Sequence, residues 1–379
     1  VELQLQGAVG ADADPGASTS VLTISDDDAA PVVAFTVGSS SAGEGVVDPQ
    51  VIEVTLSEVS GLPASVEFAV TGDATEGVDY VLGGASPLVI AAGQTSAQIP
   101  ITVLDDALDE ADETVTLSLG VATDATVGAV GSHVLTIADD DATPTVGFDQ
   151  ATLTQLESGG PVTATVSLSA ASGRDVTVPF TVTGTAADGA DYALSGPSPL
   201  VFPAGETTKA LTVTPLDDAL DEPLETVVLS LGPADFADAG AEQTFTLSLE
   251  DDDATPTVGF VSTSSTVPEA AGTVNVAVAL SAVSGQEVTV DLGLGGTATL
   301  GEDFTLPEAT VVIPAGASGA SLDLSLVGDA LYEGPETVEL QLQGAVGADA
   351  DPGASTSVLT ISDDDAAPVV AFTVGSSSA

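Results

Sequence analysis

The sequence contains no cysteine, methionine or tryptophan, and only two of its 379 residues, Arg174 and Lys209, are basic. The absence of cysteine excludes disulfides, thiolate nucleophiles and zinc–thiolate sites. A phosphate backbone is held by Lys and Arg, so nucleic acid is excluded as a partner. Direct contact with an anionic membrane surface is excluded for the same reason. The apolar runs are also much too short to span a bilayer.

The chain has no basic-then-apolar leader at its N-terminus and no initiator Met. We therefore expect it to be a segment of a longer protein, with the export signal and the anchor outside this segment.

Acidic residues are abundant, because 58 Asp and Glu give the chain a net charge of −56. Self-repulsion of this size destabilises a compact fold unless cations neutralise it. Disorder and a solvated, halophile-like acidic surface are two simpler explanations. The alternating Val, Leu and Ile residues argue against disorder, and the clustering of the acids argues against a surface that is merely solvated.

A repeat organises the chain, and an Asp-Asp-Asp triplet marks it. The triplets end at Asp28, Asp141, Asp253 and Asp365, with spacings of 113, 112 and 112 residues. Each follows an apolar run and is followed within three residues by a proline: Pro31, Pro144, Pro256 and Pro368. Such short links stiffened by proline restrict hinge motion between neighbouring units.

The repeat predicts three whole domains between two partial ones. The whole domains are residues 31–143, 144–255 and 256–367; residues 1–30 are the C-terminal fragment of a preceding domain, and 368–379 the first strand of a following one. Residues 1–42 and 338–379 are identical at an offset of 337. This identity is either an artefact of how the chain was produced or the sign of a longer array of near-identical three-domain blocks, which we favour.

Each unit has the pattern of an all-β domain. Ile52, Val54 and Leu56 alternate with polar residues, and similar runs of period two recur between turns rich in Gly, Asp and Pro. This alternation is the signature of half-buried strands, and no stretch shows a convincing helical period. About seven short strands in roughly 110 residues predict an antiparallel, immunoglobulin-like β-sandwich, repeated in tandem as a linear rod.

Acidic residues recur at fixed positions in the three units, at the ends of strands. The first unit contributes Glu44, Asp79, Asp105, Asp106, Glu110, Glu113, Asp139, Asp140 and Asp141. The second contributes Glu157, Asp191, Asp217, Asp218, Glu222, Glu225, Asp251, Asp252 and Asp253. The third contributes Glu269, Asp303, Asp329, Glu333, Glu336, Asp363, Asp364 and Asp365, and the N-terminal fragment contributes Asp26, Asp27 and Asp28.

The recurring acids predict a metal site in each domain. Alternate loops of a sandwich gather at one pole, where converging carboxylates repel one another unless a cation binds. Ligands that are all oxygen, at a flexible loop site, favour Ca²⁺ over Mg²⁺ or a transition metal. With this many acids we expect two or more Ca²⁺ ions per domain.

The same residues resemble the Calx-β domain, a family that includes regulatory domains of sodium–calcium exchangers and repeats in bacterial surface proteins. The resemblance rests on the early Glu, the Gly77–Tyr80 element, the Asp-Asp-x-x-x-Glu-x-x-Glu run and the closing Asp triplet. It implies a seven-stranded sandwich that binds Ca²⁺ where one domain meets the next. The third unit departs from the pattern, because Gly328 replaces the first Asp of the run and Tyr332 replaces the residue held by Asp109 and Asp221.

Other motifs carry little functional information. His133 stands where other units have Ser or Thr, and we expect an exposed strand position rather than a catalytic or metal-binding one. Residues 173–175 fall in what reads as a variable loop. Pairs of Asp and Glu of the glycosidase type are not excluded by composition. Because the acids recur in every unit, however, we expect no enzyme.

The leading functional hypothesis is structural: a calcium-rigidified repeat shaft of an extracellular bacterial adhesin or cell-surface filament, whose partners are further copies of the repeat. The alternative is a calcium-sensing or ligand-binding module, which predicts one or two domains of distinct sequence rather than an internal repeat.

Overall fold

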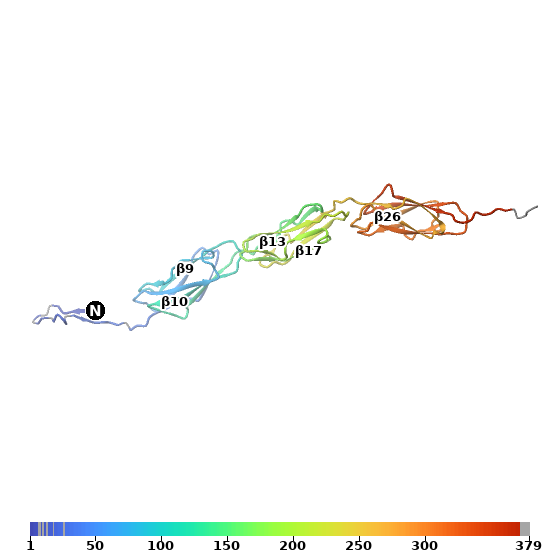
Figure 1. The fold of residues 1–379 in the computed structure, drawn as a ribbon. Helices are drawn as coiled ribbons and strands as arrows, with labels where there is room; N and C mark the ends of the chain where they lie inside the picture. Colours follow the sequence, from blue (N-terminus) through green and yellow to red (C-terminus); the bar gives the residue numbers. More distant parts are fainter. Residues whose placement is uncertain (7–8, 10, 13, 18, 26, 372–379) are drawn as a thin grey trace, which may run out of the picture. The chain divides into compact units, whose positions relative to one another are not determined.

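The computed structural model describes residues 1–6, 9, 11–12, 14–17, 19–25 and 27–371. Strands dominate this part of the chain, and its one helical element is the 3₁₀ turn η1 at Glu269–Ala271. Among the described residues, no helix has the length and apolarity that crossing a membrane would require. The predicted all-β sandwich class is confirmed (Figure 1).

The first whole domain consists of two five-stranded sheets. One sheet has the order β4-β12-β10-β6-β8 and the other β11-β3-β5-β9-β7. The strands are β3 Val32–Phe35, β4 Ser39–Gly43, β5 Gln50–Leu56, β6 Ala64–Gly72, β7 Tyr80–Leu82, β8 Leu88–Ile90, β9 Ser96–Val103, β10 Glu113–Thr123, β11 Thr126–Val127 and β12 Ser132–Ala138. Figure 1 labels β9 and β10, one from each sheet.

The second domain repeats this arrangement with one interruption. Its sheets have the orders β18-β20-β15-β13-β22 and β14-β23-β21-β17, with a separate pair β16-β19. The strands are β13 Thr145–Phe148, β14 Thr152–Leu156, β15 Val162–Leu168, β16 Val176–Val178, β17 Phe180–Gly184, β18 Tyr192–Ser195, β19 Leu200–Phe202, β20 Thr208–Pro215, β21 Glu225–Leu231, β22 Asp238–Ala239 and β23 Thr244–Glu250. The strand that is continuous as β6 is split here at Pro179, because proline has no N–H to donate to the ladder.

The third domain again has two five-stranded sheets, β28-β30-β26-β24-β32 and β25-β33-β31-β27-β29. Its strands are β24 Thr257–Phe260, β25 Ser264–Pro268, β26 Thr273–Leu280, β27 Val288–Gly296, β28 Phe304–Thr305, β29 Thr310–Ile313, β30 Gly319–Leu326, β31 Glu336–Val346, β32 Asp349–Ala350 and β33 Thr356–Ser362.

Each domain has its own hydrophobic core, built by the alternation that the sequence predicts. In β5 the side chains of Ile52, Val54 and Leu56 are buried and those between them are not. Three separate clusters of buried residues result, one centred on each sandwich. Burial of apolar surface between two facing sheets therefore stabilises each domain individually.

The chain nevertheless divides into two compact units rather than three. The first comprises Val1–Pro144 together with the loops Ala170–Asp175 and Pro203–Glu206, and the second comprises Thr145–Ser169, Val176–Phe202 and the residues from Thr207 onward. Two loops of the second sandwich thus belong with the first unit.

The first strand of each domain switches between the sheets, which sequence periodicity did not reveal. In the first domain β3 pairs with β5 in one sheet, while β4 continues in the other sheet and pairs in parallel with β12. The pairs β14–β23 and β25–β33 repeat this parallel pairing. The residues that follow two parallel strands lie at the same end of the sheet. This switch therefore brings the residue after β4 beside the Asp triplet that follows β12.

The N-terminal fragment forms the hairpin of β1 Glu2–Gln4 and β2 Thr19–Val21. Its register pairs Leu3 with Ser20, and the copy of these residues in the third domain pairs Leu340 with Ser357. The expectation that the fragment adopts the conformation of its full-domain copy is met for these strands. The corresponding first strand expected in 368–379 falls mostly on residues 372–379, outside the described part of the chain.

The expectation for His133 is wrong, because this side chain is buried in the first core at 1% exposure. It shares the inward face of β12 with Leu135 and Ile137, which period-two counting would have indicated. One ring nitrogen lies 2.8 Å from the Val37 carbonyl oxygen and the other 2.8 Å from the Ser40 hydroxyl. Both nitrogens have partners, so the imidazole serves packing and hydrogen bonding.

Candidate metal centre

The carboxylates of each domain come from strand ends that meet at one pole. In the first domain Glu44 follows β4 and the triplet Asp139–Asp141 follows β12, and the Glu44 amide donates to the Ala138 carbonyl at 3.2 Å. Asp106 follows β9, and Glu113 opens β10. Five backbone segments thus converge when Asp79, just before β7, is included.

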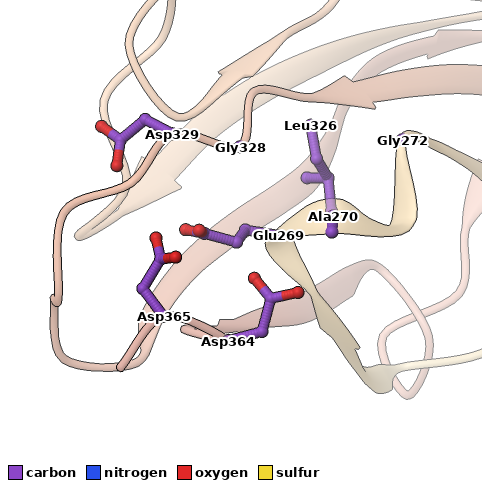
Figure 2. A pocket seen from close by; sticks show the side chains of 8 residues that line it. All are labelled: Glu269, Ala270, Gly272, Leu326, Gly328, Asp329, Asp364 and Asp365. Carbon is purple, nitrogen blue, oxygen red and sulfur yellow. The ribbon is translucent and has the colours of Figure 1, made fainter. Parts of the chain in front are cut away.

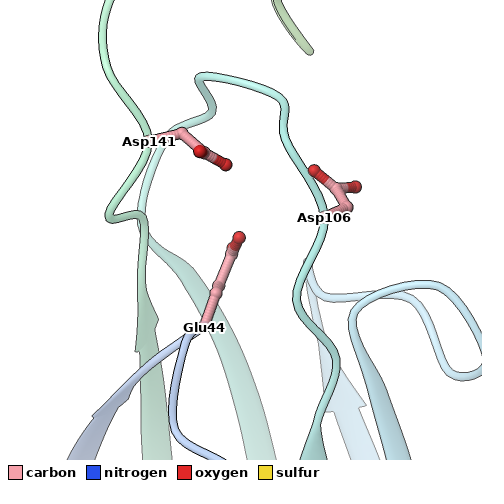
Figure 3. A group of neighbouring side chains, drawn as sticks. All are labelled: Glu44, Asp106 and Asp141. Atoms are coloured by element: carbon pink, nitrogen blue, oxygen red, sulfur yellow. The ribbon is translucent and has the colours of Figure 1, made fainter.

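Two groups of three carboxylates form at this pole. In the first group, carboxylate oxygens of Glu44, Asp106 and Asp141 all lie within 4.8 Å of one another. Figure 3 shows these three side chains pointing toward a common space. In the second group, oxygens of Asp79, Glu110 and Glu113 meet the same criterion. Each group can provide several oxygen ligands to one hard cation.

The second domain brings together the equivalent residues. One group consists of Glu157, Asp218 and Asp253, and the other of Asp191, Glu222 and Glu225. The pole geometry therefore repeats with the sequence.

The third domain keeps the first group as Glu269, Asp329 and Asp365. Figure 2 shows these carboxylates and Asp364 around a cavity that Gly328 also lines without contributing a ligand side chain. A neighbouring cavity is lined by Asp303, Glu333, Glu336 and Asp363.

The remaining acids surround these groups. Burial, and after it repulsion from Asp139, Asp140 and Asp105, raises the pKa of Asp141. Burial and repulsion from Asp251, Asp217 and Asp252 do the same for the pKa of Asp253. Asp252 also accepts a hydrogen bond from the Ser158 hydroxyl. Asp27 and Asp28 lie in the linker before β3, whereas Asp26 lies outside the described residues.

Burial and mutual repulsion raise the pKa values of the central glutamates. Removal from water, followed by repulsion from Asp139 and other neighbouring acids, raises the pKa of Glu44 from 4.5 to about 7. Burial and neighbouring carboxylates raise the pKa values of Glu113, Glu157 and Glu225 to about 7 as well. The pole is therefore an anionic site that gains stability from a proton or a cation.

Buried carboxylate oxygens at these poles make no hydrogen bond within the described chain. They are Asp139 Oδ1, Asp141 Oδ2, Glu225 Oε2, Asp251 Oδ1, Asp253 Oδ2 and Asp365 Oδ2. A buried polar atom without a partner costs free energy, and an inward-facing oxygen is the atom that a metal ligand presents. This donor set, with neither His nor Cys, fits a hard cation such as Ca²⁺.

Local backbone structure presents the aspartate loop in the same way in all three domains. Asp106 Oδ1 accepts the Leu108 amide at 2.8 Å, and the pairs Asp218–Leu220 and Asp329–Leu331 repeat this at 2.7 Å. Such Asx turns fix the loop through its own side chain. The loop shape in the third domain therefore survives the replacement at Gly328.

The fold, the pole and the donor set together agree with a family of known domains. A model of the Calx-beta domain matches three consecutive stretches, residues 26–141, 139–248 and 251–365. The chain belongs to the Calx-beta domain family. Calx-beta is a calcium-binding type of domain, and the acidic clusters fit that property. The family is regulatory or structural rather than catalytic.

Solved structures similar to this Calx-beta chain include two-domain and one-domain proteins. The chain is 20% identical to CBD12 from CALX1.2, with 58% of this chain and 100% of that one covered and a TM-score of 0.28. It is 22% identical to the apo form of the Calx CBD1 domain, with 30% and 100% covered and a TM-score of 0.28. The cadherin-like domains 1 to 4 of zebrafish RET are 14% identical, with 78% and 66% covered and a TM-score of 0.22.

Sequence reasoning missed how Asp109 and Asp221 are placed in these Calx-beta domains. Both carboxylates are buried, at 3% and 6% exposure, although they belong to acidic loops. Asp109 is paired with Arg174, which lies in the loop that had read as variable. A single unit gives no sign of this contact, and only the equal spacing of Ser60, Ser172 and Ser284 hints at it.

Proposed function

We propose that this chain is part of a calcium-stiffened repeat shaft, exported by a bacterium and carried on the cell surface as an adhesin stalk or filament. The observation that carries the proposal is that the Asp triplet closing each of the three whole domains has two roles. It supplies carboxylates to the pole of one domain, and it is the covalent link to the next strand, as in Asp139–Asp141 before β13. A cation held at the pole would therefore fix the first residues of the linker.

Two Ca²⁺ ions per domain follow from the two carboxylate groups at a pole. Glu44, Asp106 and Asp141 would hold one ion, and Asp79, Glu110 and Glu113 the other. The outer acids, such as Asp105 and Asp139, would add ligands or neutralise the remaining charge. The equivalent residues would serve the second domain, and those of the third domain would serve with fewer ligands.

The internal repeat supports a structural role. Identity of residues 1–42 with residues 338–379 is what a long array of equal blocks produces, because a shaft needs length rather than diversity. Further copies of the block are then the partners of this segment, in one chain or one filament.

Thermal unfolding tests the calcium part of the proposal. Each ion that binds only the folded state stabilises it by roughly 4 kcal/mol when free Ca²⁺ exceeds Kd about a thousandfold. We expect millimolar Ca²⁺ to raise Tm sharply and Mg²⁺ to have a much smaller effect. Equal Tm values in Ca²⁺ and in chelator would contradict the proposal. A calcium-dependent change confined to one domain would favour the sensing alternative.

A further inference from the structure

At two places a loop that carries a buried aspartate, Asp109 or Asp221, accepts hydrogen bonds from a loop after the linker that carries a serine, Ser172 or Ser284. In each case the aspartate loop and the serine loop belong to one compact unit. The Ser172 hydroxyl and the Gly173 amide donate to the Asp109 carbonyl at 3.2 and 3.1 Å. The Ser284 hydroxyl and the Gly285 amide donate to the Asp221 carbonyl at 3.2 and 3.0 Å. We call each of these contacts a latch.

The side chains at both latches are polar and complementary. The Arg174 guanidinium pairs with the Asp109 carboxylate, which also accepts the Thr143 hydroxyl at 3.1 Å. At the second latch the Gln286 amide donates to the Asp221 carboxylate at 2.8 Å. The aspartate is thus buried with hydrogen-bond partners, as a buried charge requires.

The third domain carries the same loop with a different residue at the latch position. Its Asx turn from Asp329 to Leu331 matches those of the other two domains. Tyr332 stands where they have Asp109 and Asp221, and its side chain is 57% exposed.

The first domain carries the receiving loop, already folded. The Ser60 hydroxyl accepts the Leu62 amide at 3.1 Å, as Ser172 accepts Arg174 at 3.1 Å. The Ser60 carbonyl accepts the Gly93 amide at 3.0 Å, and Ser172 accepts Gly205 at 2.9 Å.

Contacts around this loop differ from those at the two latches. A Cβ atom on Gly173 or Gly285 would collide with Glu110 or Glu222, whereas one on Gly61 would meet nothing within 4 Å. Leu62 is 60% exposed. A groove of about 420 Å³ lies here, lined by the linker 28–31, residues 59–62 and Asp124.

The Tyr332 loop and the 59–62 groove lie on either side of linkers that have the same sequence. Residues 363–371, from the closing Asp triplet of the third domain onward, are identical to residues 26–34, which run from the first Asp triplet into β3. At the two observed latches the aspartate loop lies before the linker and the serine loop after it. A further block after residue 371 would therefore bring a copy of the 59–62 groove to the Tyr332 loop.

We propose that the Tyr332 loop docks in the 59–62 groove of the next copy of the block, with the Tyr332 ring against Leu62. This inference rests on the proposed array, because it needs a following block. In this docked arrangement the Tyr332 carbonyl accepts hydrogen bonds from the Ser60 hydroxyl and the Gly61 amide of the next copy, as the aspartate carbonyls do at the other latches. Leu62 offers no partner to a carboxylate, so an Asp109-type loop placed here would bury an unpaired charge. The apolar pair thus makes the junction between blocks differ in chemistry from the two junctions inside a block.

Chemical labelling of tyrosine tests this docking on the chain extended after residue 379 by residues 43–143. The chain has three tyrosines, and Tyr80 and Tyr192 are buried at 5% exposure, so Tyr332 is the accessible one. We expect tetranitromethane to nitrate Tyr332 readily in the 379-residue chain and severalfold more slowly in the extended chain. Leu62→Asp in the added copy should restore the fast rate, while continued protection of the buried tyrosines shows that the domains remain folded.

Equal nitration of Tyr332 in both chains would overturn the proposal. A disulfide test distinguishes docking from general shielding, because the chain has no native cysteine. Tyr332→Cys with Ser60→Cys in the added copy should cross-link as readily as Asp221→Cys with Ser284→Cys, a pair joined by a β-bridge. Cross-linking of only the latter pair would also refute docking. Calcium titration of the same proteins tests the proposed function separately. Ca²⁺ binding without docking would refute only the docking, whereas absence of Ca²⁺ binding would refute the proposed function.

Discussion

Gly173 lies so close to Glu110 that a Cβ atom added to the glycine would collide with the glutamate side chain. Glu110 belongs to the carboxylate group with Asp79 and Glu113. The latch and the candidate metal centre are therefore in direct contact, and we expect a change at the latch to move a candidate ligand.

Gly173→Ala tests this contact. The new methyl group should push Glu110 out of its group and weaken Ca²⁺ binding at the first pole by about tenfold, the order seen when the support of a metal ligand is lost. Isothermal titration calorimetry measures the effect. Gly61→Ala is the matched control, since its Cβ meets nothing within 4 Å, and it should bind as the unchanged chain does. Equal losses in both variants would show that the contact does not act on the ligand.

Glu44→Gln should have opposite effects with and without calcium. The substitution removes a central ligand, so Ca²⁺ affinity at the first pole should fall by more than tenfold by the same measure. It also removes a buried charge that Asp139 and its neighbours repel, so the metal-free protein should gain stability. Urea unfolding in chelator and in Ca²⁺ measures both effects, with Glu58→Gln on the surface as the control. A loss of stability in chelator would contradict the repulsion argument.

The metal-free protein should become more stable as pH falls from about 8 to 5. Burial and repulsion raise the pKa values of Glu44 and Glu157 from 4.5 to about 7, so the folded state binds more protons than the unfolded state between these values. Stability then falls as pH rises through this window. Protons compete with Ca²⁺ for the same oxygens, so calcium affinity should change in the opposite direction. Thermal scans across pH, with and without Ca²⁺, test both trends, and a pH-independent Tm in chelator would contradict them.

The third domain should bind Ca²⁺ more weakly than the other two because Gly328 supplies no carboxylate. Gly328→Asp should strengthen binding there, since a Cβ at this position meets the Glu269 carbonyl and the Ala270 amide at ordinary distances of 3.5 Å or more. The reciprocal change Asp217→Gly should weaken binding in the second domain. Calorimetry on the two variants decides the matter, and unchanged affinity in both would mean that this position is not a ligand.

Much of the fold could be predicted because a strand with one buried face shows apolar and polar residues in alternation. Ile52, Val54 and Leu56 of β5 follow this pattern. The convergence of Glu44 with the triplet Asp139–Asp141 could be expected because acids that recur at strand ends fall in loops that gather at one pole of a sandwich. The parallel pairing of β4 with β12, which causes that convergence, is invisible in the sequence, because alternation does not say which sheet a strand joins.

The errors concern polar residues in buried places. His133 was expected outside because its counterparts are Ser and Thr, yet its position on β12 points inward, where Val37 and Ser40 satisfy both nitrogens. Asp109 reads as one more acid in an acidic loop, and the groups that contact it in its buried position include Ser172 and Arg174, far along the chain. Such burial arises from tertiary partners that no local pattern contains.

Small-angle X-ray scattering of the 379-residue chain, with Ca²⁺ and with chelator, tests the central claim most directly. If cations at the poles stiffen the links between domains, the Ca²⁺ form should have a longer and better-defined maximum dimension and the profile of a rigid particle. The metal-free form should show a shorter average extension and the profile of flexibly linked domains. Superimposable profiles in the two conditions would contradict the account.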